Sequence, residues 1–165
     1  MDQHSELKDT GAVRGADQAP PTAHQEAQHL AQATADHMYR NDAATQALGI
    51  SLQEVRPGYA RMTMTVRGDM LNGHRTCHGG YIFTLADSAF AFACNSYNLV
   101  TVAAGCAIEF LAPAFEGEAL VAEAVEQSRG SKTGVYDVTV TNAAGRKIAL
   151  MRGKSHVWKG SVLPE

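Results

Sequence analysis

One carboxylate, Asp87, lies in an otherwise almost wholly apolar stretch from Ile82 to Cys94. The apolar residues of this stretch surround the helical wheel, which is typical of a helix that is buried on most sides. An ionised Asp inside such a helix must be paired, hydrated or used in chemistry. Just before it, His78-Gly79-Gly80 offers free backbone N–H groups at a helix start, where the helix dipole favours negative charge. These features predict a site for an oxyanion or a phosphate.

The polar residues of this helix are few and regularly spaced. They are Thr84, Asp87, Ser88 and Asn95, with the small Ala91 between them. Spacings of three and four residues place them along one narrow seam of the helix. Asp87 could instead be a structural carboxylate bonded to a loop N–H, but Asp is almost never fully buried unless it is paired, so a functional role is favoured.

The elements that position this helix can be predicted from periodicity and turn residues. We expect a surface helix over 23–40 and a short second helix capped by Asp42. Strands are expected at 50–56, 59–66, 101–110, 119–128, 135–142 and 147–158. The last four have a spacing that suits an antiparallel meander. One long apolar helix among strands predicts an α+β fold in which the sheet curls around the helix.

Composition limits the classes of protein that the chain can be. Its 165 residues, 45% apolar and 19% charged, suit one domain over 23–165, and the polar residues 1–22 are expected to form a disordered tail. A net charge of −3 without a Lys/Arg cluster argues against nucleic acid as the main partner. No apolar run is long enough to span a membrane and no signal peptide is evident, which predicts a cytoplasmic protein without membrane contact.

The cysteines give no sign of a metal or a disulfide framework. There are three, an odd number, and none is in a CxxC pair, so neither a zinc site nor a disulfide set is predicted. A carboxylate and a backbone N–H donor need no metal or cofactor to act on a carbonyl group. We therefore expect neither a metal nor a cofactor.

Two segments carry a resemblance to a known family. Residues 70–80, MLNGHRTCHGG, and 85–96, LADSAFAFACNS, resemble the hotdog-fold acyl-CoA thioesterases of phenylacetic acid degradation, the hydroxyphenylacetyl-CoA thioesterase family. Later segments that also resemble it are 107–118, 134–138 and 152–156. The resemblance covers roughly 36–158, and the combination of these motifs is more specific than HGG alone.

The resemblance implies a hotdog fold in which about five to six antiparallel strands wrap a central helix. It also implies a homotetramer built as a dimer of dimers, and substrates that are coenzyme A thioesters of phenylacetate or its ring-hydroxylated forms. Residue by residue, it places the catalytic carboxylate at Asp87, the N–H that polarises the carbonyl at Gly79 and a polar orienting group at Asn72. Some relatives carry Glu at the acidic position, so the shorter Asp leaves direct attack and water activation both open.

Other candidate residues have a structural interpretation beside the functional one. His78 is expected to orient the loop or its ligand rather than act as the base. The sequence around it shows no recognisable set of a nucleophile, a base and a residue that orients the base. Asn72 could be a turn residue or could hold the thioester or water. The substrate-binding candidates are Gly80, Thr84 and Ser88, with Arg129, Ser131 and Lys132 for the phosphates of coenzyme A. Aromatic residues of the helix can line an aryl pocket or simply form core.

Helix geometry adds one constraint to this interpretation. Eight residues separate Gly79 from Asp87, or about 12 Å along a helix axis, which is too far for both to contact one carbonyl. Either the donor is another group or two chains build each site, and the resemblance favours two chains. The rival functions are an acyl-CoA-binding hotdog protein without turnover and a hotdog dehydratase.

Overall fold

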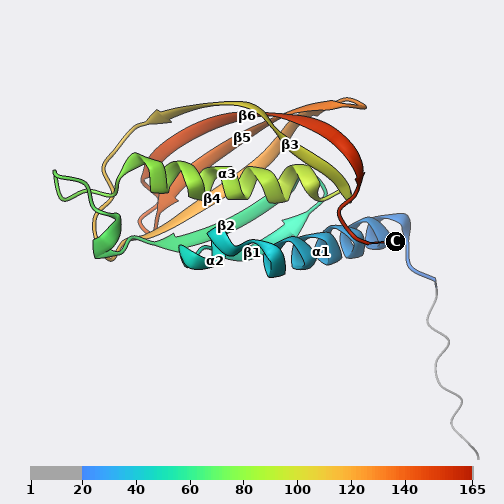
Figure 1. Ribbon diagram of the computed structural model, residues 1–165, viewed down its shortest axis with the longest axis horizontal. Coiled ribbons are helices and arrows are strands. Elements are labelled where there is room, and N and C mark those ends of the chain that lie inside the picture. The colour runs from blue at the N-terminus through green and yellow to red at the C-terminus, as the bar shows by residue number, and fades with distance from the viewer. Residues whose placement is uncertain (1–19, 165) are drawn as a thin grey trace, which may run out of the picture.

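The computed structural model describes residues 20–164, which form a six-stranded sheet curled around one long helix (Figure 1). The helices are α1 (Ala23–Asn41), α2 (Ala43–Ala47) and α3 (Gly79–Asn95), with a 3-10 turn at Gly68–Met70. The strands are β1 (Ser51–Arg56), β2 (Tyr59–Thr65), β3 (Leu99–Phe110), β4 (Ala119–Arg129), β5 (Thr133–Asn142) and β6 (Lys147–Ser161). The predicted α+β hotdog fold is confirmed.

The strand order differs from the predicted meander. The sheet runs β1-β2-β4-β5-β6-β3, and every neighbouring pair is antiparallel. The strands β4, β5 and β6 do form a meander, but β3 pairs with β6 instead of β4. The reason is that α3 crosses the concave face after β2, so the chain enters the sheet again at its far edge while β4 takes the place beside β2.

The N-terminal helices begin at polar caps. Thr22 accepts a hydrogen bond from the Gln25 N–H, and the Gln25 side chain in turn accepts one from the Thr22 N–H. Asp42 accepts from the Thr45 N–H at 3.0 Å and so caps α2, as the sequence predicted. The predicted tail lies largely outside the described residues.

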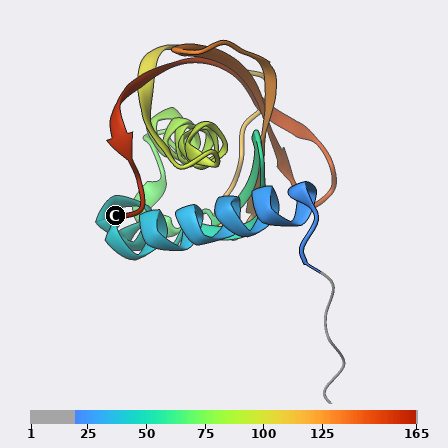
Figure 2. The same ribbon diagram turned by 90° about the vertical axis from the view of Figure 1, so that its right-hand side faces the viewer.

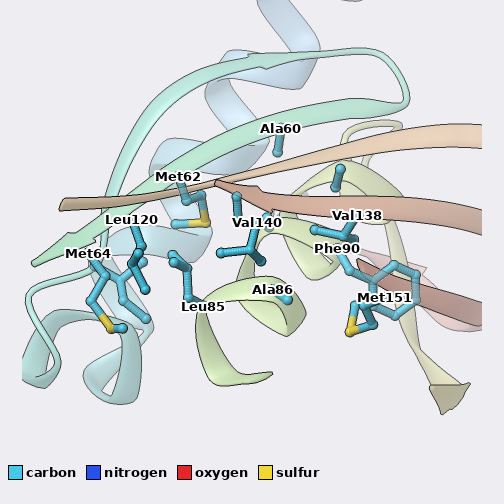
Figure 3. Packing of buried hydrophobic residues seen from close by; sticks show 14 of the residues in the cluster. Ala60, Met62, Met64, Leu85, Ala86, Phe90, Leu120, Val138, Val140 and Met151 are labelled. Carbon is cyan, nitrogen blue, oxygen red and sulfur yellow. The ribbon is translucent and has the colours of Figure 1, made fainter. Parts of the chain in front are cut away.

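The core is the contact between α3 and the concave face of the sheet. In Figure 2, where α3 is seen end-on, the sheet arches over α3, and α1 lies across the opposite side of the helix. Figure 3 shows Leu85, Ala86 and Phe90 of α3 meeting side chains from four strands. The backbone of Gly153 on β6 lies so close to the Phe90 ring that a Cβ at that position would approach it to 2.9 Å. This packing fixes which side of α3 remains open.

Candidate active site

One side of α3 is not covered by any other part of residues 20–164. Gly80, Thr84, Asp87 and Ala91 follow one another at spacings of four, three and four residues, and none of them is buried. Residues at these spacings lie on one face of a helix. The open face therefore presents the Asp87 carboxylate among small and polar neighbours.

Two residues of the predicted polar seam point into the protein instead. The Ser88 hydroxyl is buried, 3.3 Å from the Thr45 hydroxyl of α2. The Asn95 side chain is also buried and bonds both the N–H and the C=O of Thr101, each at 2.9 Å. Asn95 thus ties the end of α3 to the start of β3, and Ser88 could meet a substrate only by leaving its contact with Thr45.

The carboxylate of Asp87 is half-buried and has little to balance its charge. Within residues 20–164, its one hydrogen-bond partner is the Cys106 thiol of β3, with Sγ 4.0 Å from Oδ1. No Lys, Arg or His of that part of the chain forms an ion pair with it. Burial therefore raises the pKa of Asp87. A carboxylate with a raised pKa is a better base near neutral pH.

The Cys106 thiol is a donor to this carboxylate and not a nucleophile. Burial and the nearby charge of Asp87 both raise the pKa of Cys106. Because only the thiolate attacks carbon readily, both effects disfavour Cys106 as a nucleophile.

Removing the charge of Asp87 should stabilise the fold at neutral pH. Burial raises its folded-state pKa above the unfolded value, so folding favours the protonated form and wild type loses stability as the pH rises through the raised pKa. We expect Asp87→Asn to have the higher Tm at pH 7, and the gap to close below about pH 3.9, the unfolded pKa of Asp, where the wild-type carboxyl is protonated in both the folded and the unfolded states. Thermal melts at equal protein concentration measure this, at about 2–4 °C per kcal/mol.

Asp137 provides a control, because its pKa is shifted in the opposite direction to that of Asp87. Its carboxylate accepts hydrogen bonds from Arg152 at 2.6 and 2.8 Å, and these contacts hold its pKa below the usual range. The stability from this pair is present above the unfolded pKa and is lost as the pH falls through the lowered one. Asp137→Asn should therefore lower Tm at pH 7. A lower Tm for both variants would mean that burying Asp87 does not weaken the fold.

The first turn of α3 is organised by His78. This residue is the N-cap, and its Nδ1 accepts a hydrogen bond from the Gly80 N–H at 2.9 Å. The ring proton of neutral His78 must then lie on the exposed Nε2. His78 is therefore placed to hold the turn, which is the role that the sequence favoured over a base.

The N–H of Gly79 is left available by this turn. It is the first residue of α3, and no acceptor for its N–H is found within residues 20–164. The Phe110 ring of β3 lies directly beside it, with Cζ 2.9 Å from the position that a Cβ would take. Only glycine fits here without moving the ring, so the sequence and the packing together keep one helix-terminal donor free.

Asn72 shapes the loop that leads into this turn. Its side-chain oxygen accepts hydrogen bonds from the N–H groups of His74 and Thr76 at 2.9 and 3.2 Å, and its Nδ2 donates to the Thr76 hydroxyl at 3.0 Å. The turn role that the sequence left open is thus visible. The side chain also reaches the same pocket as Gly79, so its position is compatible with a second role in orienting a ligand.

The structure brings some predicted site residues together and separates others. Asn72 and Gly79 line one pocket of about 510 Å³, with Phe110 and Leu111 on its apolar wall. The residues His78, Gly80 and Thr84 line a neighbouring hollow of about 420 Å³. Asp87 lines neither, because it lies eight residues farther along α3. One chain therefore presents the N–H donor and the carboxylate at separate places.

The predicted phosphate-binding residues lie near the opposite end of α3. The Arg129 guanidinium stacks on the Tyr97 ring at 3.8 Å, and its Nε lies 3.6 Å from Glu126. Ser131 and Lys132 are exposed in the turn after β4. Tyr97 follows the end of α3, whereas Gly79 is at its start. The length of the helix, about 24 Å, therefore separates this cluster from the Gly79 end.

Sequence reasoning missed Cys106 and Phe110. Both lie on the face of β3 that meets α3, and together with Ile108 they alternate along the strand. This period-2 pattern was the available signal, but it does not reveal which helix residues the strand will meet. Cys106 is beside Asp87, and Phe110 is beside Gly79.

Two classes of feature are not found in residues 20–164. No cluster of three or more His, Cys, Asp or Glu side chains in this part of the chain could hold a metal ion. None of its helices is both long and apolar enough to cross a membrane.

Comparisons with known proteins identify the family of the chain. Residues 74–149 match the thioesterase superfamily. The chain is 49% identical over 137 residues to the acyl-coenzyme A thioesterase PaaI of Escherichia coli. These aligned residues cover 83% of this chain and 98% of that protein. The structure of Escherichia coli PaaI, from the phenylacetic acid degradation operon, matches with a TM-score of 0.80 over 81% of this chain and 97% of that one.

Two further structures extend the likeness. A variant of the phenylacetic acid degradation protein PaaI from Thermus thermophilus is 36% identical, with a TM-score of 0.69 over 71% of this chain and 100% of that one. A Streptococcus mutans protein bound to acetyl CoA is 28% identical, with a TM-score of 0.65 over 68% of this chain and 90% of that one. The chain therefore belongs to the thioesterase superfamily, as a hotdog-fold enzyme of the PaaI type.

Proposed function

We propose that the enzyme hydrolyses coenzyme A thioesters of phenylacetate and ring-hydroxylated phenylacetates to the free acid and coenzyme A. The Escherichia coli relative is named an acyl-coenzyme A thioesterase, and the Streptococcus mutans relative binds acetyl CoA, which supports this substrate class. The Escherichia coli relative comes from the phenylacetic acid degradation operon, which supports an aryl group in the acyl part of the substrate.

The observation that carries the proposal is the state of Asp87. A carboxylate kept for structure would be expected to bond a cation or several N–H groups, whereas Asp87 has only the distant Cys106 thiol within the described residues. A half-buried carboxylate without such support is destabilising, and a role in catalysis explains why it is present.

Hydrolysis needs a base or nucleophile and an electrophilic donor on opposite sides of the carbonyl. In one route, Asp87 takes a proton from water as the oxygen attacks the carbonyl carbon, and the proton then passes to the sulfur as the C–S bond breaks. In the other route, Asp87 attacks the carbonyl carbon, and the C–S bond breaks to release the thiolate of coenzyme A. Water then cleaves the mixed anhydride, which returns the Asp87 carboxylate and releases the acid, and a proton from this water passes to the thiolate. In both routes, the Gly79 N–H stabilises the negative charge that develops on the carbonyl oxygen.

The site is proposed to form between two subunits. Because one α3 holds Gly79 and Asp87 about 12 Å apart, a Gly79 donor can serve the Asp87 of one protomer only from the partner. We propose that Gly79 of one chain meets Asp87 of the other in a dimer, and that two dimers form the tetramer. In this arrangement Asn72 and His78 shape the donor turn, while Thr84 and Gly80 line its open side.

Arg129, Ser131 and Lys132 are proposed to contact the phosphates of coenzyme A. Two cations and the N–H groups of a turn suit such a ligand. Arg129 is already stacked on Tyr97, which gives its guanidinium a fixed direction. Lys132 is exposed and its ammonium can follow the ligand.

A panel of acyl-CoAs tests the substrate. We expect phenylacetyl-CoA and its ring-hydroxylated forms to exceed straight-chain acyl-CoAs in kcat/KM. For the hydroxylated forms the expected advantage is about tenfold, because a polar group that meets the ring hydroxyl is left unpaired by an alkyl chain. Thiol release, measured by a coupled colour reaction, gives the rates. Equal or better efficiency with hexanoyl-CoA or decanoyl-CoA would overturn the aryl assignment and leave thioester hydrolysis standing.

A further inference from the structure

Two large apolar side chains, at the last residue of β3 and at the residue after it, are exposed within residues 20–164. Phe110 and Leu111 are each 52% exposed, and both line the pocket that holds the Gly79 N–H. Large apolar groups exposed beside a pocket commonly mark the place where an apolar ligand packs.

The ring of Phe110 has a fixed relation to this donor. Its Cζ and Cε1 atoms lie 2.9 and 3.2 Å from the position of the Cβ that Gly79 lacks. Phe110 also lies in a paired strand, opposite Ala149 of β6. A regular strand thus holds an aromatic ring in contact with the turn that would bind the carbonyl oxygen.

The pocket combines one apolar wall with one polar end. Phe110, Leu111 and Pro113 form part of the apolar wall, and Asn72 and Thr76 lie at the polar end. A molecule with a carbonyl oxygen next to a flat apolar group matches both parts. An alkyl chain would use the apolar wall but not the ring geometry of Phe110.

We propose that Phe110 is the specificity-determining residue of the enzyme, against whose ring the aryl group of the acyl chain packs while the neighbouring Gly79 N–H binds the carbonyl oxygen. This inference rests on the proposed function and adds to it the side chain that recognises the acyl group. Aromatic pairs in offset or edge-to-face contact bind better than their buried area alone predicts, so the ring selects aryl over alkyl groups.

Phe110→Leu tests this role, with Phe115→Leu as the matched control. Phe115 is 49% exposed in the β3–β4 connection but does not line the pocket. For each variant and wild type, kcat/KM is measured with phenylacetyl-CoA and with hexanoyl-CoA, and Tm and oligomeric state are recorded. The ratio of the two efficiencies reports specificity and is insensitive to the amount of active enzyme.

We expect Phe110→Leu to lower the phenylacetyl-to-hexanoyl ratio by about two- to tenfold, and Phe115→Leu to leave it unchanged. An unchanged ratio in Phe110→Leu would overturn the proposal. If both efficiencies fall equally, the ratio is also unchanged, and the ring then only supports the Gly79 turn. The wild-type ratio tests the proposed function separately, because a wild type that prefers hexanoyl-CoA can still lose phenylacetyl-CoA efficiency through Phe110→Leu.

Discussion

Asp87→Asn should lower kcat for thiol release by about 10²–10⁴-fold while the protein remains folded. The amide is nearly isosteric with the carboxylate, but it can neither take a proton from water nor attack a carbonyl. The side chain makes no ion pair within residues 20–164, so its replacement disrupts no charged contact there. Steady-state kinetics with saturating phenylacetyl-CoA measure the loss.

The matched control is Asp137→Asn. It makes the same chemical change on the outer face of the sheet, where the carboxylate pairs with Arg152. This variant should keep kcat within a few-fold of wild type, because Arg152 and Asp137 lie on the face turned away from α3. If Asp87→Asn keeps near-native turnover on every acyl-CoA that wild type cleaves, Asp87 is structural and the proposed chemistry is wrong.

The sequence predicted α3 and the turn at its start well because both depend on local features. The apolar wheel around Asp87 marks a buried helix, and the glycines after His78 mark a free helix start. Asp42 likewise predicted the cap of α2. Such signals lie within a few residues of the feature that they predict.

The features that the sequence did not predict depend on contacts between distant segments. The place of β3 beside β6 depends on how α3 crosses the sheet, and no spacing in the chain encodes this. The same holds for Cys106 beside Asp87 and for Phe110 beside Gly79, which follow from the register of β3 against α3. Ser88 belonged to the polar seam by its spacing, but α2 covers it through Thr45.

Mixed dimers of two inactive variants test the central claim, which is that one site takes Gly79 from one chain and Asp87 from the other. Gly79→Pro should be inactive because proline has no backbone N–H to offer the carbonyl oxygen, and the first position of a helix such as α3 tolerates proline. Asp87→Asn lacks the carboxylate. A mixed dimer then contains one site with both defects and one site with neither.

The measurement is thiol release after the two variants are unfolded together, refolded at equal concentration and shown to form mixed dimers by differently tagged chains. Random pairing makes about half of the dimers mixed, each with one intact site of two, so the account predicts about a quarter of wild-type activity. Verified mixed dimers that release no more thiol than the separate variants would contradict it, because sites built within single chains stay inactive in every pairing.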